Sequence, residues 1–230
     1  MAGLCTNCEE TKMRDQYGAL ISWPDFTKDL ATRLEKAGAW ETGISSDRRG
    51  LGVAINLDLY GYDVEQGLAV FQVRQAIFHP SRPTRVRKNY FLCGTTETGS
   101  PFAHPVDSPA RSKRALASPQ ACVKYVLAKI WQCSEDTLSD IERQGDVAFV
   151  PVKDVPKTAE EIEGPVMLRD SHEVRGRLFR DWDGTLYTVR GARLLHKKGQ
   201  HAAVKARGGF YRIQEGVRVP TWSFSMQVGD

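Results

Sequence analysis

Short β-branched and aromatic runs, separated by glycine, proline and threonine, constrain the fold of this 230-residue chain more than any other feature. Four such runs follow one another between residues 52 and 106: GVAINLDLYGYD, LAVFQVRQAIFH, RVRKNYFLCG and PFAHPV. Runs of this length with turn residues between them are typical of antiparallel strands. We therefore predict a meander of four strands, in which the last two runs form a hairpin across TTETGS.

Two helices are expected beside this meander. The first covers about residues 24–36, because Pro24 suits the first helical position and Gly38 is a stop signal. The second is ACVKYVLAKIW, for which Ser118 and Pro119 supply a cap and a first position. The segment SEDTLSDIE predicts one more short helix.

The C-terminal third returns to the strand pattern, with up to eight short runs from VAFVPV to VPTWSF. Asp183-Gly184 between two of them is a type I′ hairpin signal. This regular spacing indicates a small β-barrel or sandwich. We thus expect an α+β protein with an N-terminal arm (1–20), an α+β domain (21–140) containing the antiparallel meander, and a small β-barrel-like domain (141–230).

Composition and missing motifs exclude several classes of protein. No apolar run approaches the roughly 18 residues of a membrane span. The N-terminus MAGLCTNCEETKM lacks the basic and apolar regions of a secretory signal, so we expect a cytoplasmic protein with no membrane partner. A P-loop, a dinucleotide-binding glycine motif and a G-x-S-x-G motif are also missing, which excludes nucleotide-driven motors, dinucleotide oxidoreductases and α/β-hydrolases.

Positive charge is concentrated in two zones, although the net charge is only +4. Residues 74–114 hold eight Lys or Arg against two Asp or Glu, and residues 169–230 hold twelve against six. Such zones attract the phosphates of nucleic acids. An ordinary solvated face is the alternative.

The segment HPSRPTRVRKNY is the strongest nucleic-acid signal. Strand alternation would place Arg85, Arg87 and Asn89 on one face, where cations can track phosphates and nearby aromatic rings can stack on bases. The alternative is an edge strand that carries charge to prevent aggregation. The cations predicted to contact nucleic acid are Arg82, Arg85, Arg87, Lys88, Arg111, Lys113, Arg114 and Lys198.

Three histidines, His172, His196 and His201, fall within thirty residues of the basic C-terminal segment. If LLHKKGQH is a hairpin, His196 and His201 lie near each other at its two strand ends. Three imidazoles could hold a divalent metal such as zinc or iron and leave a position open for water. No other cofactor is expected.

The same residues allow a metal-free interpretation. One imidazole could accept the proton of a 2′-hydroxyl and another could protonate the leaving oxygen in RNA cleavage. Lys197 or Lys198, Arg193 and Tyr187 would then supply charge stabilisation and a further acid. The third interpretation is structural, with the histidines hydrogen-bonded in turns or exposed.

The five cysteines give little functional information. Cys5 and Cys8 form a C-x-x-C pair without a second pair at zinc-finger distance, so a zinc site would need partners elsewhere. Cys93, Cys122 and Cys133 stand singly in apolar runs and are predicted to be core thiols.

Four motifs of the C-terminal third carry a resemblance to a family. They are Gln144-Gly145-Asp146-Val147, the Ser171-His172 turn with Gly176, Leu195-His196 followed by His201, and the Gly-Phe-Tyr-x-Ile run at residues 209–213. On the basis of these motifs, about 80 residues of the C-terminal third resemble uncharacterised small β-domain proteins of bacteria and their phages. The resemblance implies that the three histidines belong together and points to a bacterial or phage conflict system, but implies no activity. The chain departs from the usual pattern after Tyr211.

These observations favour a nucleic-acid-binding accessory protein that faces RNA, with nucleic acid and other protein subunits as its partners. The alternatives are a histidine-dependent nuclease or hydrolase, with or without a metal, and a scaffold subunit of a larger complex.

Overall fold

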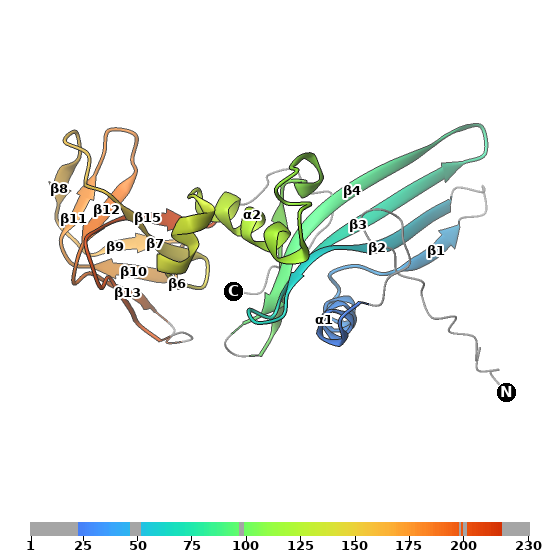
Figure 1. Ribbon diagram of the computed structural model, residues 1–230, viewed down its shortest axis with the longest axis horizontal. Coiled ribbons are helices and arrows are strands. Elements are labelled where there is room, and N and C mark those ends of the chain that lie inside the picture. The colour runs from blue at the N-terminus through green and yellow to red at the C-terminus, as the bar shows by residue number, and fades with distance from the viewer. Residues whose placement is uncertain (1–22, 47–51, 97–98, 198, 200–201, 218–230) are drawn as a thin grey trace. The chain divides into compact units, whose positions relative to one another are not determined.

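The computed structural model describes residues 23–46, 52–96, 99–197, 199 and 202–217 (Figure 1). The N-terminal arm expected over residues 1–20 and the last expected strand, VPTWSF, lie outside the described residues. The described chain divides into two compact units. The N-terminal unit comprises residues 23–95 and 101–123, and the C-terminal unit comprises residues 124–217 together with the short segment 96–100. One boundary between the units falls inside the second helix, between residues 123 and 124.

Helices and strands alternate with short turns in both units. The helices are α1 (Asp25–Lys36) and α2 (Pro119–Trp131), with 3-10 turns η1 (Pro109–Arg111) and η2 (Glu135–Asp140). The N-terminal strands are β1 (Gly43–Ser46), β2 (Gly52–Asp63), β3 (Leu68–His79), β4 (Arg82–Thr95) and β5 (Pro101–Val106). The C-terminal strands are β6 (Glu142–Gln144), β7 (Val147–Val152), β8 (Glu160–Ile162), β9 (Val166–Leu168), β10 (His172–Arg175), β11 (Leu178–Arg180), β12 (Leu186–Val189), β13 (Arg193–His196), β14 (Val204–Lys205) and β15 (Phe210–Glu215).

The predicted meander is confirmed. Strands β2 to β5 pair antiparallel in chain order, β4 and β5 form the predicted hairpin, and short β1 adds a fifth strand beside β2. The three long strands β2, β3 and β4 dominate the N-terminal sheet (Figure 1). Local β-branched and aromatic content thus set the strand pattern, and sequential turns set the pairing.

Helix α1 covers one face of this sheet and closes the N-terminal core. Its buried Leu30 and Leu34 belong to the same apolar cluster as Phe71 of β3 and Phe91 of β4. Trp40 lies in contact with both rings, with centroid distances of 5.9 Å to Phe71 and 5.7 Å to Phe91. The predicted helix is therefore confirmed, and it ends where Gly38 adopts a positive φ of 80°.

Helix α2 begins as predicted, and Ser118 caps it by accepting a hydrogen bond from the Ala121 backbone N–H at 3.0 Å. Its first turn approaches β2 at Gly61. A Cβ placed on Gly61 would lie 2.4 Å from Cys122 Cβ and 2.6 Å from the Pro119 carbonyl oxygen. Because one of these atoms belongs to the backbone, only glycine permits this distance between helix and strand.

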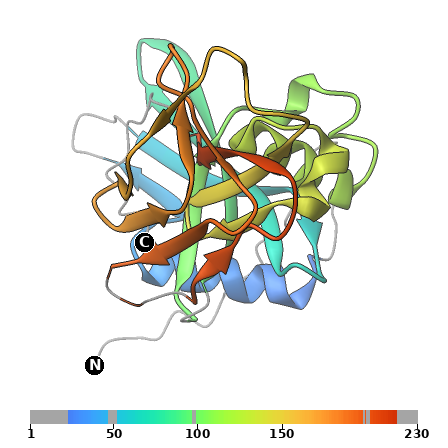
Figure 2. The same ribbon diagram turned by 90° about the vertical axis from the view of Figure 1, so that its left-hand side faces the viewer.

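The C-terminal unit contains a six-stranded and a four-stranded antiparallel sheet (Figure 2). The six-stranded sheet has the order β6-β7-β15-β12-β11-β8, and the four-stranded sheet has the order β14-β13-β10-β9. Both contribute to one apolar core, with Phe149 and Ile213 from the first sheet and Val174 and Leu194 from the second. Neither sheet closes into a barrel among the described residues.

The β11–β12 hairpin forms at Asp183-Gly184 as predicted, but its turn is not type I′. That turn needs two residues with positive φ, and of these two only Gly184 has one, at 86°. The Asp183 carboxylate instead accepts a hydrogen bond from the Thr185 N–H at 2.8 Å. This local bond favours a wider turn over residues 181–185.

No described helix is long and apolar enough to cross a membrane.

Replacement of Gly61 by Ala tests the contact between α2 and β2. The added methyl group cannot fit without moving the helix, so Gly61→Ala should lower the free energy of unfolding by about 1 to 3 kcal/mol, as overpacking does. Gly52→Ala is the matched control, because its Cβ would meet its nearest atoms at 3.5 Å, an ordinary contact distance. Urea unfolding followed by tryptophan fluorescence measures both. Equal midpoints for the two variants would contradict the close approach.

Candidate nucleic-acid interface and the buried histidine pair

The first half of β4 is exposed without interruption. All seven residues from Arg82 to Lys88 are exposed, whereas residues 90–94 of the same strand are buried. Strand β5 pairs with β4 only between Tyr90 and Thr95, so among the described residues the first half of β4 is a free edge of the sheet. A seven-residue edge segment that buries neither face is available for binding.

The register of β3 and β4 assigns these cations to faces of the sheet. Arg85 lies opposite Ile77 and Arg87 lies opposite Gln75, so both arginines project from one face, as the alternation predicted. Lys88 lies opposite Arg74 and projects from the other face. The edge therefore presents positive charge on both sides.

Apolar side chains accompany the cations on the Lys88 face. Phe78 is 41% exposed and Val86 is 51% exposed, which is unusual for large apolar residues of a sheet. Phe78 pairs with Gly52 of β2, whose missing side chain leaves room for the ring to lie across the neighbouring strand. An aromatic ring and cations thus share this face, a combination suited to bases and phosphates.

A polar cluster that sequence reasoning missed lies on the Lys88 face of the sheet, opposite the face that carries Phe71 and Phe91. The side-chain amide of Gln72 is buried and donates hydrogen bonds to the hydroxyl oxygens of Tyr90 at 2.6 Å and Tyr60 at 3.1 Å. Burial and the hydrogen bond with Tyr90 raise the pKa of Tyr60, because both favour its protonated hydroxyl. The sequence did offer a signal for this cluster. Asp58 and Tyr60 are two residues apart and therefore lie on one face of their predicted strand, and Gln72 is a polar residue within the next apolar run.

Asp58 is the carboxylate of this cluster. One of its oxygens lies 3.6 Å from an Arg74 guanidinium nitrogen. Burial raises the pKa of Asp58, and the charges of Arg74 and Lys88 only partly oppose this rise. The cluster therefore holds a desolvated carboxylate beside the basic face.

The other predicted cations of this unit also reach solvent. Arg111 ends η1, and Lys113 and Arg114 stand in the turn that follows, with all three side chains exposed. Lys198 lies outside the described residues. Nucleic-acid contact by these four cations therefore stays a prediction.

The structure brings two of the three predicted histidines together. His172 of β10 pairs directly with His196 of β13, and their rings lie 4.9 Å apart between centroids and almost perpendicular. Both are buried, with exposed fractions of 3% and 9%. Strands β13 and β14 form the predicted hairpin, although His201 in its loop lies outside the described residues.

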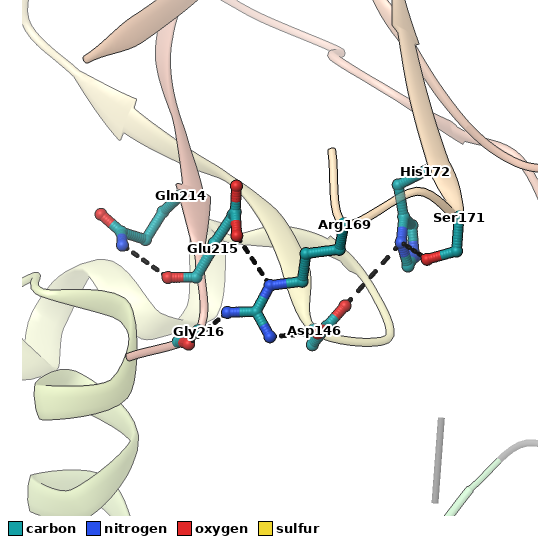
Figure 3. Close-up of polar contacts among 7 residues, drawn as sticks. All are labelled: Asp146, Arg169, Ser171, His172, Gln214, Glu215 and Gly216. Carbon is teal, nitrogen blue, oxygen red and sulfur yellow. Dashed lines mark hydrogen bonds and ion pairs between the residues drawn. The ribbon is translucent and has the colours of Figure 1, made fainter. Parts of the chain in front are cut away.

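A network of ion pairs holds the turn that leads into His172 (Figure 3). The Arg169 guanidinium donates to Asp146 at 2.6 Å, to Glu215 at 2.7 Å and to the Gly216 carbonyl oxygen at 2.9 Å. Its side chain is 24% exposed, so these charge-assisted bonds are partly shielded from water. One side chain thereby ties together the β6–β7 turn, the end of β15 and the β9–β10 turn.

The network continues to the histidine pair. The second oxygen of Asp146 lies 3.8 Å from His172 Nδ1, and the Ser171 hydroxyl lies 3.0 Å from the same nitrogen. Arg169 and Asp170 have positive φ values of 47° and 58°, conformations that non-glycine residues seldom adopt. The ion pairs of Arg169 offset the cost of this turn, which positions His172.

The structure also places the residues that were expected to act together with the histidines. Tyr187, the expected further acid, lies on β12 of the six-stranded sheet, whereas the histidines lie on the four-stranded sheet. Lys197 is exposed, and its backbone N–H donates to the Ser171 carbonyl oxygen at 2.8 Å. Within the described ranges, no group of three His, Cys, Asp or Glu side chains could hold a metal.

The cysteines of the described chain are structural in character. Cys93 and Cys122 are buried, and Cys133 is partly buried. Burial raises the pKa of Cys122 to about 12, which keeps this thiol protonated and unreactive near neutral pH. Cys5 and Cys8 lie outside the described residues.

No protein-family model, no curated protein and no solved structure matches this chain. The resemblance to small β-domain proteins of bacteria and phages therefore stays a prediction.

Loss of Arg169 should destabilise the C-terminal unit. Arg169→Ala leaves Asp146 and Glu215 without their shared cation, so we expect a loss of about 2 to 3 kcal/mol in the free energy of unfolding. Arg177→Ala is the matched control, because it breaks a two-bond pair with Glu161 whose side chains are 61% and 52% exposed, and it should therefore have little effect. Urea unfolding measures both, and equal losses would show that Arg169 has no special role.

The buried carboxylate of Asp58 should make stability depend on pH. Burial raises the folded-state pKa above the unfolded one, so ionisation of Asp58 costs stability as the pH rises through the folded pKa. Asp58→Asn removes this cost, and its stability relative to the wild type should increase between about pH 3 and pH 7. Exposed Asp107→Asn is the control. A difference that stays constant across the range would contradict the assignment.

Proposed function

We propose that this protein is a nucleic-acid-binding accessory protein and that the first half of β4 contacts the phosphate backbone of an RNA strand. The observation that carries the proposal is the run of seven exposed edge residues with four cations: Arg82, Arg85, Arg87 and Lys88. We further propose that the protein acts in the cytoplasm and that its C-terminal unit is a small β-sandwich.

Exposure on both faces distinguishes this segment from an ordinary strand. A sheet normally buries at least one face, and β4 does so from Tyr90 onward. Before that point β4 continues to pair with β3, but its side chains contribute nothing to the apolar core. Residues that the fold does not need for stability are the ones available for a partner.

The chemistry of the neighbouring side chains favours single-stranded RNA. Single-stranded nucleic acids are held by cations that track the backbone and by aromatic rings on which bases stack. Phe78 offers such a ring on the face that also carries Lys88 and Arg74. A purely protective charged edge would need the cations but not an exposed aromatic ring.

Charge removal from β4 tests the proposal. The quadruple variant Arg82→Gln, Arg85→Gln, Arg87→Gln and Lys88→Gln should bind a single-stranded RNA more weakly than the wild type. With about 0.7 counterions released per phosphate contact on a single strand, the slope of log K against log salt should fall by about 3 in magnitude. Filter binding at several salt concentrations measures this slope.

A matched variant controls for net charge. Lys28, Lys36, Lys153 and Lys157 are exposed cations outside β4, and their combined replacement by Gln removes the same charge. We expect this variant to keep the wild-type slope to within about one contact. Equal loss of slope in the two variants would reduce the interaction to general attraction by a basic protein and would refute a defined surface on β4.

A further inference from the structure

Three cations stand in a row across the four-stranded sheet of the C-terminal unit. The register places Arg175 of β10 opposite Arg193 of β13, and Arg193 opposite Lys205 of β14. Opposed residues of antiparallel strands lie about 4.5 to 5.5 Å apart at their Cα atoms, so the row extends over about 10 Å. We call Arg175, Arg193 and Lys205 the cation row.

The cation row lies on the outer face of this sheet. The neighbours of its members along the three strands, Val174, Leu194 and Val204, belong to the apolar core of the unit. Because successive side chains of a strand point to opposite faces, the cation row points away from that core. All three cations are exposed.

The charges of the row are poorly compensated. Glu173 forms an ion pair with Arg175, and the hydrogen bond from Arg175, with the charges of Arg175 and Lys197, lowers the pKa of Glu173. Arg193 and Lys205 have no carboxylate within ion-pair distance among the described residues. Like charges directly opposite each other destabilise a sheet. The fold gains nothing from this arrangement, whereas a bound polyanion would neutralise it.

Two apolar side chains lie beside the cation row, one on each side of Glu173. Met167 and Leu195 flank Glu173 in the next row of the same face, two residues further along the strands, and Met167 is 38% exposed. Two residues along a strand correspond to about 7 Å. A strand of nucleic acid laid across the sheet could thus place phosphates on the cations and sugars or bases over Met167 and Leu195.

We propose that the cation row is a second binding site for the phosphate backbone of a nucleic-acid strand, separate in the chain from β4. Two of its three members are arginines, whose planar guanidinium groups match phosphate oxygens with paired hydrogen bonds. This inference rests on the proposed function, because it assumes that nucleic acid is the ligand. It adds the second unit to the binding surface.

The test compares variants of the full chain in the same salt titration with single-stranded RNA. Arg193→Gln combined with Lys205→Gln should lower the magnitude of the salt slope by about 1.4, the value for two lost contacts. Lys153→Gln combined with Lys157→Gln removes the same charge from exposed positions outside the row and should leave the slope unchanged. The unfolding midpoint of the row variant should equal or exceed that of the wild type, because repulsion is relieved.

Separate outcomes distinguish the two proposals. If the quadruple β4 variant loses slope and the row variant does not, the cation row is refuted and the proposed function stands. If the row variant loses slope while the β4 variant does not, the row is supported and the β4 assignment fails. A wild-type protein whose binding shows no salt dependence overturns both. A row variant that unfolds earlier than the wild type shows that the cations stabilise the sheet, which also overturns the inference.

Discussion

The pairing of β3 with β4 extends beyond the apolar core, and the binding surface proposed for the N-terminal unit depends on that extension. Near Phe71 and Phe91 the two strands belong to the apolar core, and beyond Val73 they stay paired while all seven β4 residues from Arg82 to Lys88 are exposed. Hydrogen bonds between the strands hold this part of the sheet, so the exposed β4 side chains have no role in the core. This freedom allows consecutive cations on β4 that a buried strand could not tolerate.

A comparable separation of roles exists in the C-terminal unit. Arg169 gathers two carboxylates and a carbonyl oxygen, and so fixes the turn that carries His172 against His196. This polar network is partly shielded from water, as suits a structural role. The cation row lies on the outer face of the four-stranded sheet. The register places the histidine pair on the opposite face, together with the core residues Val174 and Leu194.

The two proposed surfaces have the same composition. In each, the strand register places cations on a face that contributes nothing to a core, with an exposed apolar side chain nearby, Phe78 in one unit and Met167 in the other. Polyanion binding depends mostly on the number of phosphates neutralised, so two modest surfaces on one chain can act together.

Local sequence determined the helices, the meander and the strand-rich character of the C-terminal third. Turn residues and the spacing of apolar residues act over a few positions, so Pro24, Gly38 and Ser118 were sufficient to delimit α1 and the start of α2. Alternation along β4 likewise placed Arg85 and Arg87 on one face. The prediction of a type I′ turn at Asp183-Gly184 was wrong. The hydrogen bond from the Thr185 N–H to the Asp183 side chain outweighed the preference of the Asp-Gly dipeptide for that turn.

Tertiary structure alone decided the contacts between residues distant in the chain. Nothing local pairs His172 with His196, gathers Asp146 and Glu215 around Arg169, or aligns Arg175, Arg193 and Lys205, since each depends on which strands become neighbours. The sequence could not show that the two C-terminal sheets stay open, because closure depends on the hydrogen bonds between edge strands and not on the pattern within a strand.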